Sequence, residues 1–294
     1  MLIRDHTFMK FKGCLLPIFL FMSFLGTTLD AQPNRAPVVI KPHQLTDHLY
    51  MLEGQGGNIG FLSGPEGVLI VDTQFPHVAP QIIKTVGEMS DGKIQYVLNT
   101  HFHGDHTGGN QVIGAGATII GHNKVRERLE ASDRTPDGAL PTITYTSQMS
   151  LNFGGEEIHM IHLGPGHTDT DSVIYFKSSN ALHMGDLFFN GRFPYIDLNS
   201  GGSVSGYLSN IKKVLGMTNQ ETKIIPGHGQ LASREDLVSF INMFDDCFQA
   251  VSKAKAEGQT LEEVTKAGLP KKYEEWGKAF INEERWISFL YAGS

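Results

Sequence analysis

Three histidines and an aspartate lie within six consecutive residues of this chain, in the segment HFHGDH at positions 101–106. Imidazole nitrogens and carboxylate oxygens are groups that zinc and related cations bind in proteins. Side chains two residues apart in an extended segment project to the same side, so His101 and His103 are placed to bind one cation. Asp105 and His106 point elsewhere, which favours a second cation close by. Burying these rings without a cation would leave polar groups unpaired, at a cost of several kcal/mol.

Further candidate ligands occur at three later points of the chain. A catalytic zinc has about four ligands, one of which is water, so the cluster needs donors from distant sequence. The segments GPGHTDTD, HMGD and IPGHG offer His167, Asp186 and His228, each next to glycine and each after an expected strand. Loops at strand ends commonly bring active-site residues together on a rigid frame. One carboxylate, Asp186, is able to bridge two cations.

The remaining histidines have simpler interpretations. A single histidine is more often a surface or satisfied core residue than a ligand. We interpret seven histidines in this way: His6, His43, His48, His77, His122, His159 and His162. His183 is intermediate, because strand alternation places it near Asp186, where we expect it to support a ligand rather than bind metal.

Short apolar segments alternate with amphipathic segments along the chain, which is typical of a layered α/β protein. The expected strands cover residues 49–52, 59–62, 68–71, 95–98, 118–120, 157–162, 173–176, 181–184 and 223–225. Helical spacing of apolar residues occurs between Ala79 and Val86 and between Val204 and Leu215. From Ser233 onward, apolar residues again follow a helical period. We therefore expect one domain over residues 32–294, including a helical C-terminal extension, residues 233–294.

The N-terminal segment, residues 1–31, is typical of a secretory signal peptide. Lys10 and Lys12 precede an apolar run from Cys14 to Phe21, and small residues lead to Ala31. The alternative is a membrane anchor, but the run contains Pro17 and is shorter than the roughly 20 residues that cross a bilayer. We expect cleavage near Ala31, export to the periplasm or the medium, and no stable membrane anchor.

Composition limits the partners of this chain. The 294 residues are 40% hydrophobic and 19% charged, which suits a folded core. The formal charge is −7, and loss of residues 1–31, which carry three basic and two acidic residues, would make it −8. Because nucleic acid requires basic surface, we expect no nucleic-acid partner. Cleavage would leave only Cys247, so no internal disulfide is expected. The oligomeric state stays open.

The motifs HFHGDH, GHT, GD and GHG, in this order, resemble the motif series of the metallo-β-lactamase superfamily. The resemblance extends from the first strands to about His228. It implies a four-layer αββα sandwich with two metal ions at one edge of the sheets. It also implies roles for eight residues: His101, His103 and His167 bind a first zinc; Asp105, His106 and His228 bind a second; Asp186 bridges both; and Asp72 braces the site without binding metal.

Two zinc ions a few ångströms apart would lower the pKa of a shared water, making hydroxide available as a nucleophile. Asp105 would hold its metal and orient the water. This chemistry predicts a hydrolase of a small-molecule acyl bond in an ester, thioester, lactone or lactam. The chain lacks a Gly-x-Ser-x-Gly segment, and Cys247 lies on an apolar helix face, so no other nucleophile is indicated.

The alternatives follow from departures within the family. The best-known zinc β-lactamases carry cysteine where Asp186 stands, and another type carries serine there, so β-lactamase proper is an alternative. A second is an iron-dependent redox member, such as a sulfur dioxygenase, and iron or manganese in place of zinc is not excluded. A non-catalytic binding protein is a third, disfavoured because no ligand is missing.

Substrate contacts are expected from loops around the metals. Candidate segments are the glycine-rich residues 53–58 and the proline-containing residues 132–147. Asn190, Arg192 and Tyr195 follow Asp186 closely and are expected to contact a polar or anionic substrate.

Overall fold

A strand that is apolar at every position shows how the sequence sets the layers. The computed structural model describes residues 38–294, and the expected signal peptide, residues 1–31, lies outside them. In β4 (Gly67–Val71), Val68 and Ile70 face one apolar core, whereas Leu69 and Val71 face another. Alternate side chains of a strand point to opposite faces of its sheet, so this strand must be covered on both sides.

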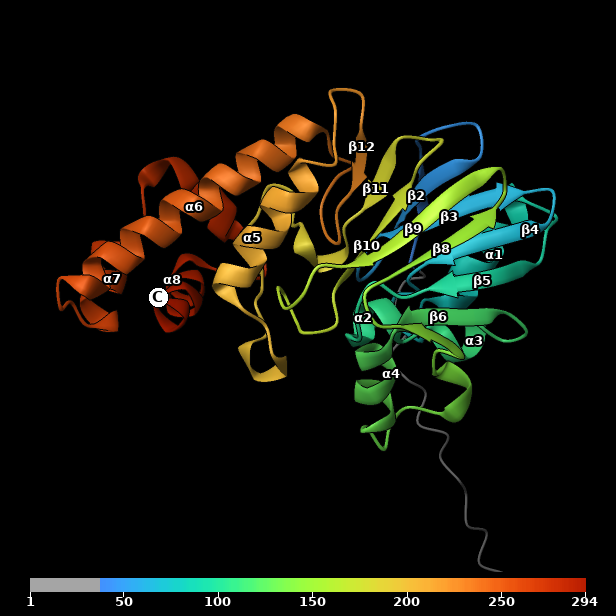
Figure 1. Cartoon of the computed structure of the whole chain (residues 1–294), viewed down its shortest axis with the longest axis horizontal. Coiled ribbons are helices and arrows are strands. Elements are labelled where there is room, and N and C mark those ends of the chain that lie inside the picture. Colours follow the sequence, from blue (N-terminus) through green and yellow to red (C-terminus); the bar gives the residue numbers. More distant parts are fainter. Residues whose placement is uncertain (1–37) are drawn as a thin grey trace, which may run out of the picture. The chain divides into compact units, whose positions relative to one another are not determined.

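One face of this strand is covered by a second sheet, which is stacked on the first (Figure 1), and the other face is covered by helices. The first has seven strands in chain order: β1 (Lys41–Gln44), β2 (Leu49–Glu53), β3 (Ile59–Gly64), β4, β5 (Ile94–Leu98), β6 (Thr118–His122) and β7 (Ile143–Tyr145). The pairs from β1 to β4 are antiparallel, and those from β4 to β7 are parallel. Parallel neighbours require crossovers, which α1 (Ala79–Met89), α2 (Gly104–Thr107), α3 (Asn110–Ile113) and α4 (Asn123–Glu130) provide.

The second sheet has five strands in the order β12-β11-β10-β9-β8. They are β8 (Gln148–Phe153), β9 (Glu156–His162), β10 (Ser172–Phe176), β11 (Ala181–His183) and β12 (Lys223–Ile225). Only the β11–β12 pair is parallel, and α5 (Val204–Leu215) lies in its connection.

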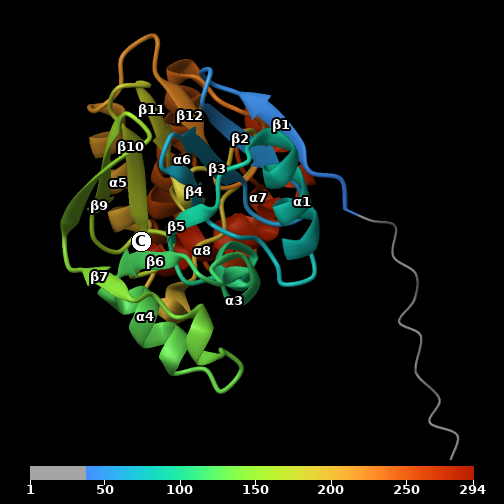
Figure 2. The same ribbon diagram turned by 90° about the vertical axis from the view of Figure 1, so that its right-hand side faces the viewer.

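Three apolar cores separate four layers. One core lies between the sheets, a second joins the first sheet to α1 and α3, and a third joins the second sheet to α5 and the C-terminal helices. Figure 2 shows α1 on the opposite side of the sheets from α5. The expected αββα sandwich is therefore confirmed, and its strands match the predicted ones within a residue or two at their ends.

The C-terminal extension consists of α6 (Arg234–Ala256), α7 (Leu261–Ala267), the 3-10 helix η4 (Lys271–Lys278) and α8 (Glu283–Gly293). Ser233 and Asp236 form a capping box at the start of α6. The fully buried Trp286 of α8 packs edge-on against Phe244, with ring centroids 4.9 Å apart, and stacks on Phe193 at 5.8 Å. Because Phe193 lies in the loop after β11, these contacts tie the extension to the edge of the second sheet.

The strands β1, β7 and β8, the helices α2, α3 and α4, and three short 3-10 helices were not predicted from the sequence. Residues 132–147, expected as a loop, contain η1 (Asp137–Ala139) and the edge strand β7. The strand β8 alternates exposed polar residues with half-buried ones, a weak pattern without a central apolar run. The other two of these short 3-10 helices are η2 (Gly185–Leu187) and η3 (Leu198–Ser200). Among residues 38–294, no helix has both the length and the apolar character needed to cross a membrane.

We predict that Cys247 reacts with thiol reagents only after unfolding. Its side chain is buried in α6, and burial raises the pKa of the thiol to about 12, so almost no thiolate forms near neutral pH. Iodoacetamide at pH 8 should leave the Cys247 peptide unmodified in the native protein and label it fully in guanidinium chloride, as mass spectrometry would show. Rapid labelling of the native protein would contradict the burial of this side chain.

Candidate metal centre

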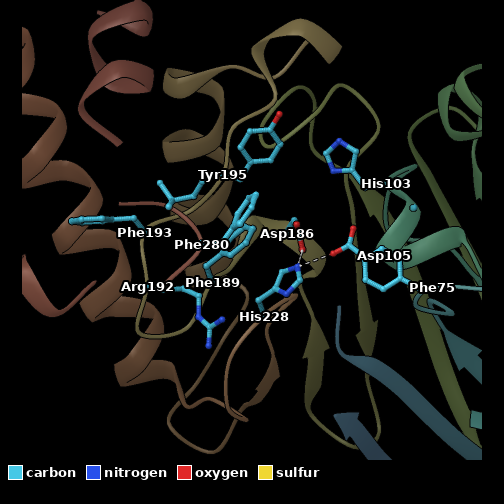
Figure 3. Close-up of a pocket in the computed structure, with 12 residues that line it drawn as sticks. Phe75, His103, Asp105, Asp186, Phe189, Arg192, Phe193, Tyr195, His228 and Phe280 are labelled. Atoms are coloured by element: carbon cyan, nitrogen blue, oxygen red, sulfur yellow. Dashed lines mark ion pairs between the residues drawn. The ribbon is translucent and has the colours of Figure 1, made fainter. Parts of the chain in front are cut away.

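The candidate ligands lie where several strands end at one edge of the two sheets. The segment 101–106 follows β5, His167 follows β9, Asp186 lies in η2 directly after β11, and His228 follows β12. Figure 3 shows Asp105, Asp186 and His228 converging from these separate elements. Residues as far apart in the chain as His101 and His228 therefore meet at one place.

The seven candidates form two groups of potential ligand atoms. The first group contains His101, His103, His167 and Asp186, and the second contains Asp105, His106 and His228. Within each group, the atoms that face inward lie within 4.8 Å of one another. This division is the one that the family resemblance implies.

The carboxylate of Asp186 faces both groups. Its Oδ2 atom lies 3.4 Å from Nε2 of His167, whereas its Oδ1 atom lies 3.0 Å from Nε2 of His106 and 3.4 Å from Nε2 of His228. The side chain is buried, with 5% of its surface exposed. A carboxylate in this position has one oxygen for each of two cations.

Several inward-facing atoms have no hydrogen bond. Among residues 38–294, Nε2 of His101 is buried without a hydrogen-bond partner, and Nε2 of His106 and Oδ1 of Asp186 have no hydrogen bond although they form an ion pair 3.0 Å long. Leaving a buried polar atom unpaired costs about 1–3 kcal/mol. Because imidazole and carboxylate donors in groups of three or four suit divalent cations, the arrangement fits two such ions.

For four of the five histidines, the second ring nitrogen contacts a group outside the site. His106 donates through Nδ1 to Asp72 at 2.7 Å, and His167 donates through Nδ1 to the backbone carbonyl of Tyr195 at 2.8 Å. His101 places Nδ1 3.1 Å from the hydroxyl of Thr100. Such contacts fix the tautomer and the orientation of a ligating imidazole.

Asp72, for which a bracing role was predicted, lies behind His106. Besides contacting His106, it accepts hydrogen bonds from the backbone and hydroxyl of Thr100, at 2.8 and 2.7 Å. Its backbone has a left-handed conformation with φ of 64°, which aspartate tolerates better than most residues. The carboxylate therefore fixes both the loop after β5 and one histidine of the second group.

Asp197 has the equivalent position beside the first group, and it was not predicted. His103 donates through Nε2 to Asp197 at 3.0 Å and turns Nδ1 toward the group. Asp197 lies at the start of η3 in a polar loop, where its side chain also accepts a hydrogen bond from the backbone of Ser200. Nothing in that local sequence distinguishes this carboxylate from a simple helix cap.

His183 lies beside the site, outside both ligand groups. Its Nε2 donates to the backbone carbonyl of Asn58 at 3.0 Å, and its Nδ1 accepts from the backbone of Gly185. The glycine-rich loop that contains Asn58 packs against the second group. A Cβ atom at Gly57 would collide with the ring of His106, so this position requires glycine. The loop at 53–58 therefore lies next to the site.

A cavity of about 510 Å³ opens in front of the two groups. Arg192 and Tyr195 line it, whereas Asn190 does not and instead donates its side-chain amide to the carbonyl of Gln230. Figure 3 shows Tyr195, Phe189 and Phe280 on the side of the cavity opposite Phe75 and Asp105. The segment 132–147 contributes to a neighbouring hollow instead.

The histidines of the two groups differ in their protonation state. Burial lowers the pKa of His167 to about 4, which keeps this ring neutral, as a metal ligand must be. For His228, burial alone would lower the pKa, but the carboxylates of Asp186 and Asp105 outweigh it and raise the pKa to about 9. Burial alone would raise the pKa of Asp186, yet the charge on His106 and His228 holds it well below its usual range. Without a cation, the second group is thus an ion-paired cluster.

Comparison with known proteins gives one family. Residues 52–228 match the family model described as "Metallo-beta-lactamase superfamily". A hydroxyacylglutathione hydrolase from Nitrosococcus oceani is 29% identical over 139 residues, which cover 46% of this chain and 49% of that protein. A metallo-beta-lactamase type 2 from Bacillus sp. (strain 170) is 22% identical over 261 residues, covering 79% of this chain and 98% of that protein.

The fold also resembles solved structures. A metallo-beta-lactamase from Pontibacter korlensis is 15% identical, with a TM-score of 0.63, over 70% of this chain and 99% of that protein. This chain spans about half the length of the hydrolase from Nitrosococcus oceani, and 58% of the length of a nematode relative, the "Beta-lactamase-like protein 2 homolog" of Caenorhabditis elegans.

We predict that Asp72 and Asp197 support different cations. Asp72→Asn and Asp197→Asn should each lower the affinity for one of two metal equivalents by roughly 10- to 100-fold, because each removes the carboxylate behind one histidine. Competition with a chromophoric chelator would resolve the two binding steps. Asp133→Asn is a matched control, since Asp133 is exposed. Weakening of the same step by both variants would contradict this assignment.

Binding of the second cation should depend on pH. Below about pH 9 a proton on His228 competes with the cation, and the charged ring of His106 must lose a proton as well, so the affinity should fall as pH falls, by about tenfold per pH unit between pH 8 and pH 7 for each proton released. Calorimetric titration in buffers of different ionisation enthalpy would count the protons. Binding without proton release at pH 7 would contradict the raised pKa of His228.

Proposed function

Because the chain belongs to the metallo-beta-lactamase superfamily and brings seven candidate ligands together in two groups, we propose that it is a dinuclear zinc hydrolase of a small-molecule acyl bond. The observation that carries this proposal is the position of Asp186, whose two carboxylate oxygens face the two groups. A single-cation site has no need for a buried carboxylate turned both ways.

The residues of the chain divide the work of hydrolysis. His101, His103 and His167 would hold one cation, Asp105, His106 and His228 would hold the other, and Asp186 would join them. When bound, the two cations would supply Lewis acidity, which lowers the pKa of water and polarises a carbonyl. Asp105 is one-quarter exposed at the cavity, where it is placed to orient the attacking water by accepting a hydrogen bond.

The names of the relatives suggest which kinds of acyl bond this chain cleaves. The relatives include proteins named hydroxyacylglutathione hydrolase and metallo-beta-lactamase type 2, so small esters, thioesters, lactones and lactams form the test set. The relative named hydroxyacylglutathione hydrolase favours an acyl substrate other than a β-lactam. An aspartate at position 186, where the best-known zinc β-lactamases have cysteine, agrees with that preference.

We propose zinc as the metal in both groups. Its support is the donor set, which consists of five imidazoles and two carboxylates. Iron and manganese bind the same donors, so elemental analysis of protein purified without added metal decides among them. About two zinc atoms per chain are expected, and two iron atoms would favour the redox alternative.

Export of the protein is a separate proposal that rests on the sequence of residues 1–31 alone. Expression of the full chain in a bacterial host should give a periplasmic protein whose N-terminus lies close to residue 32, as intact-mass measurement would show. Recovery of the uncleaved chain in the membrane fraction would support an anchor instead.

We predict that hydrolysis by the zinc-loaded protein requires both the metal and Asp105. A panel of lactone, thioester, β-lactam and phosphodiester compounds should show turnover of at least one acyl compound and none of the phosphodiester. A chelator should abolish this turnover, and Asp105→Ala should lower kcat by about 100- to 10,000-fold. Asp133→Ala is the control and should retain activity. Undiminished turnover by Asp105→Ala would exclude the proposed role of this carboxylate.

A further inference from the structure

We infer that the C-terminal extension makes Phe280 a specificity-determining wall of the cavity, so that preferred substrates carry an aromatic or branched apolar group next to the scissile acyl bond. This inference rests on the proposed hydrolase function and names its substrate class. It concerns the side of the cavity opposite Asp105, where the lining residues are mainly apolar.

The cavity has the size and lining of a small-molecule site. Its volume of about 510 Å³ lies within the roughly 300–1,000 Å³ typical of ligand pockets. Five of its lining residues are large and apolar: Phe75, Phe189, Phe193, Phe280 and Ile281. His103, Asp105, Asp186 and His228 lie at the same cavity, so a ligand that reaches these groups also touches the apolar side.

Phe280 is unusual among the apolar residues of this cavity. Its side chain is 75% exposed, whereas Phe193 and Ile281 at the same cavity are almost fully buried. An aromatic ring left in water gains stability when another apolar group covers it. Because the ring lines the cavity, part of a bound substrate is well placed to cover it.

The ring of Phe280 is held in place although it is exposed. The guanidinium of Arg285 lies 5.2 Å from the ring centroid of Phe280 and 5.2 Å from that of Tyr195. It also lies 5.7 Å from the ring of Phe289. Cations above aromatic faces attract the rings, so Arg285 links Phe280 to Tyr195 and makes a continuous aromatic surface.

The surrounding chain is fixed by the core. Ile281 is buried beside Phe280, and Trp286 of α8 stacks on Phe193. The backbone of Phe193 donates a hydrogen bond to the carbonyl of Trp276 at 3.0 Å. The extension therefore presents Phe280 from a packed support, which a selective wall requires.

Matched substrate pairs test the inference. Among thioesters of N-acetylcysteamine, the phenylacetyl compound should have a higher kcat/KM than the acetyl compound. Among acetate esters, the benzyl ester should have a higher kcat/KM than the ethyl ester. Phe280→Ala should lower kcat/KM for the preferred aromatic member about 10- to 50-fold, mainly through KM, and change the small member less than about twofold.

Two further variants separate selectivity from stability. Phe280→Leu keeps an apolar side chain and should retain most of the preference for the aromatic substrate. Leu261→Ala is the matched control, because Leu261 is also a partly exposed apolar residue of the extension but lies in α7 and does not line the cavity. It should leave all substrate ratios unchanged.

A binding measurement keeps this inference distinct from the proposed activity. Calorimetric titration of the zinc-loaded protein should show tighter binding of phenylacetate than of acetate, and Phe280→Ala should remove most of the difference. If no acyl compound is hydrolysed, the proposed function fails while this titration still tests the wall. The inference would be overturned if Phe280→Ala left two quantities unchanged: the ratio of kcat/KM within each substrate pair, and the ratio of the affinities for phenylacetate and acetate.

Discussion

The structure depends on the packing of five imidazoles and two carboxylates, most of them withdrawn from water, at one edge of two sheets. Burial opposes every charge in this cluster, yet Asp186 stays ionised beside His106 and His228, and His228 stays ionised beside Asp186 and Asp105. Like-charged and unpaired atoms remain, among them Nε2 of His101. The four layers hold these buried side chains together by placing rigid strand ends around them. Bound divalent cations would pair with the polar atoms that have no partner in the protein.

Hydrogen bonds from outside the cluster fix the orientation of its imidazole rings. Asp72 behind His106 and Asp197 behind His103 each hold one ring nitrogen so that the other faces inward. These two carboxylates come from opposite halves of the sandwich, one after β4 and the other after β11. Asp72 therefore supports His106 of the second group directly and His101 of the first group through Thr100, whereas Asp197 supports His103 of the first group.

Much of this arrangement could be predicted from the sequence, and the reasons are local. The run Val68–Val71 is apolar at each position, and Asp72 follows it directly, so both the strand and the residue at its end are recognisable. Asp197 was missed because a polar loop offers no spacing to identify it. Phe280 was missed for a different reason: its place at the cavity is set by the packing of Trp286 and Arg285, which only the folded tail defines.

The loop after β11 has a consequence for energetics. Its Tyr195 contributes a backbone carbonyl to His167 and an aromatic ring to the surface formed with Phe280, and two residues later its Asp197 contacts His103. One short segment is thus shared between the first ligand group and the apolar side of the cavity. A cation bound by the first group would restrict the motion of this segment, and a ligand on the apolar side of the cavity would then lose less entropy on binding. Cation binding and ligand binding would therefore strengthen each other by the same factor.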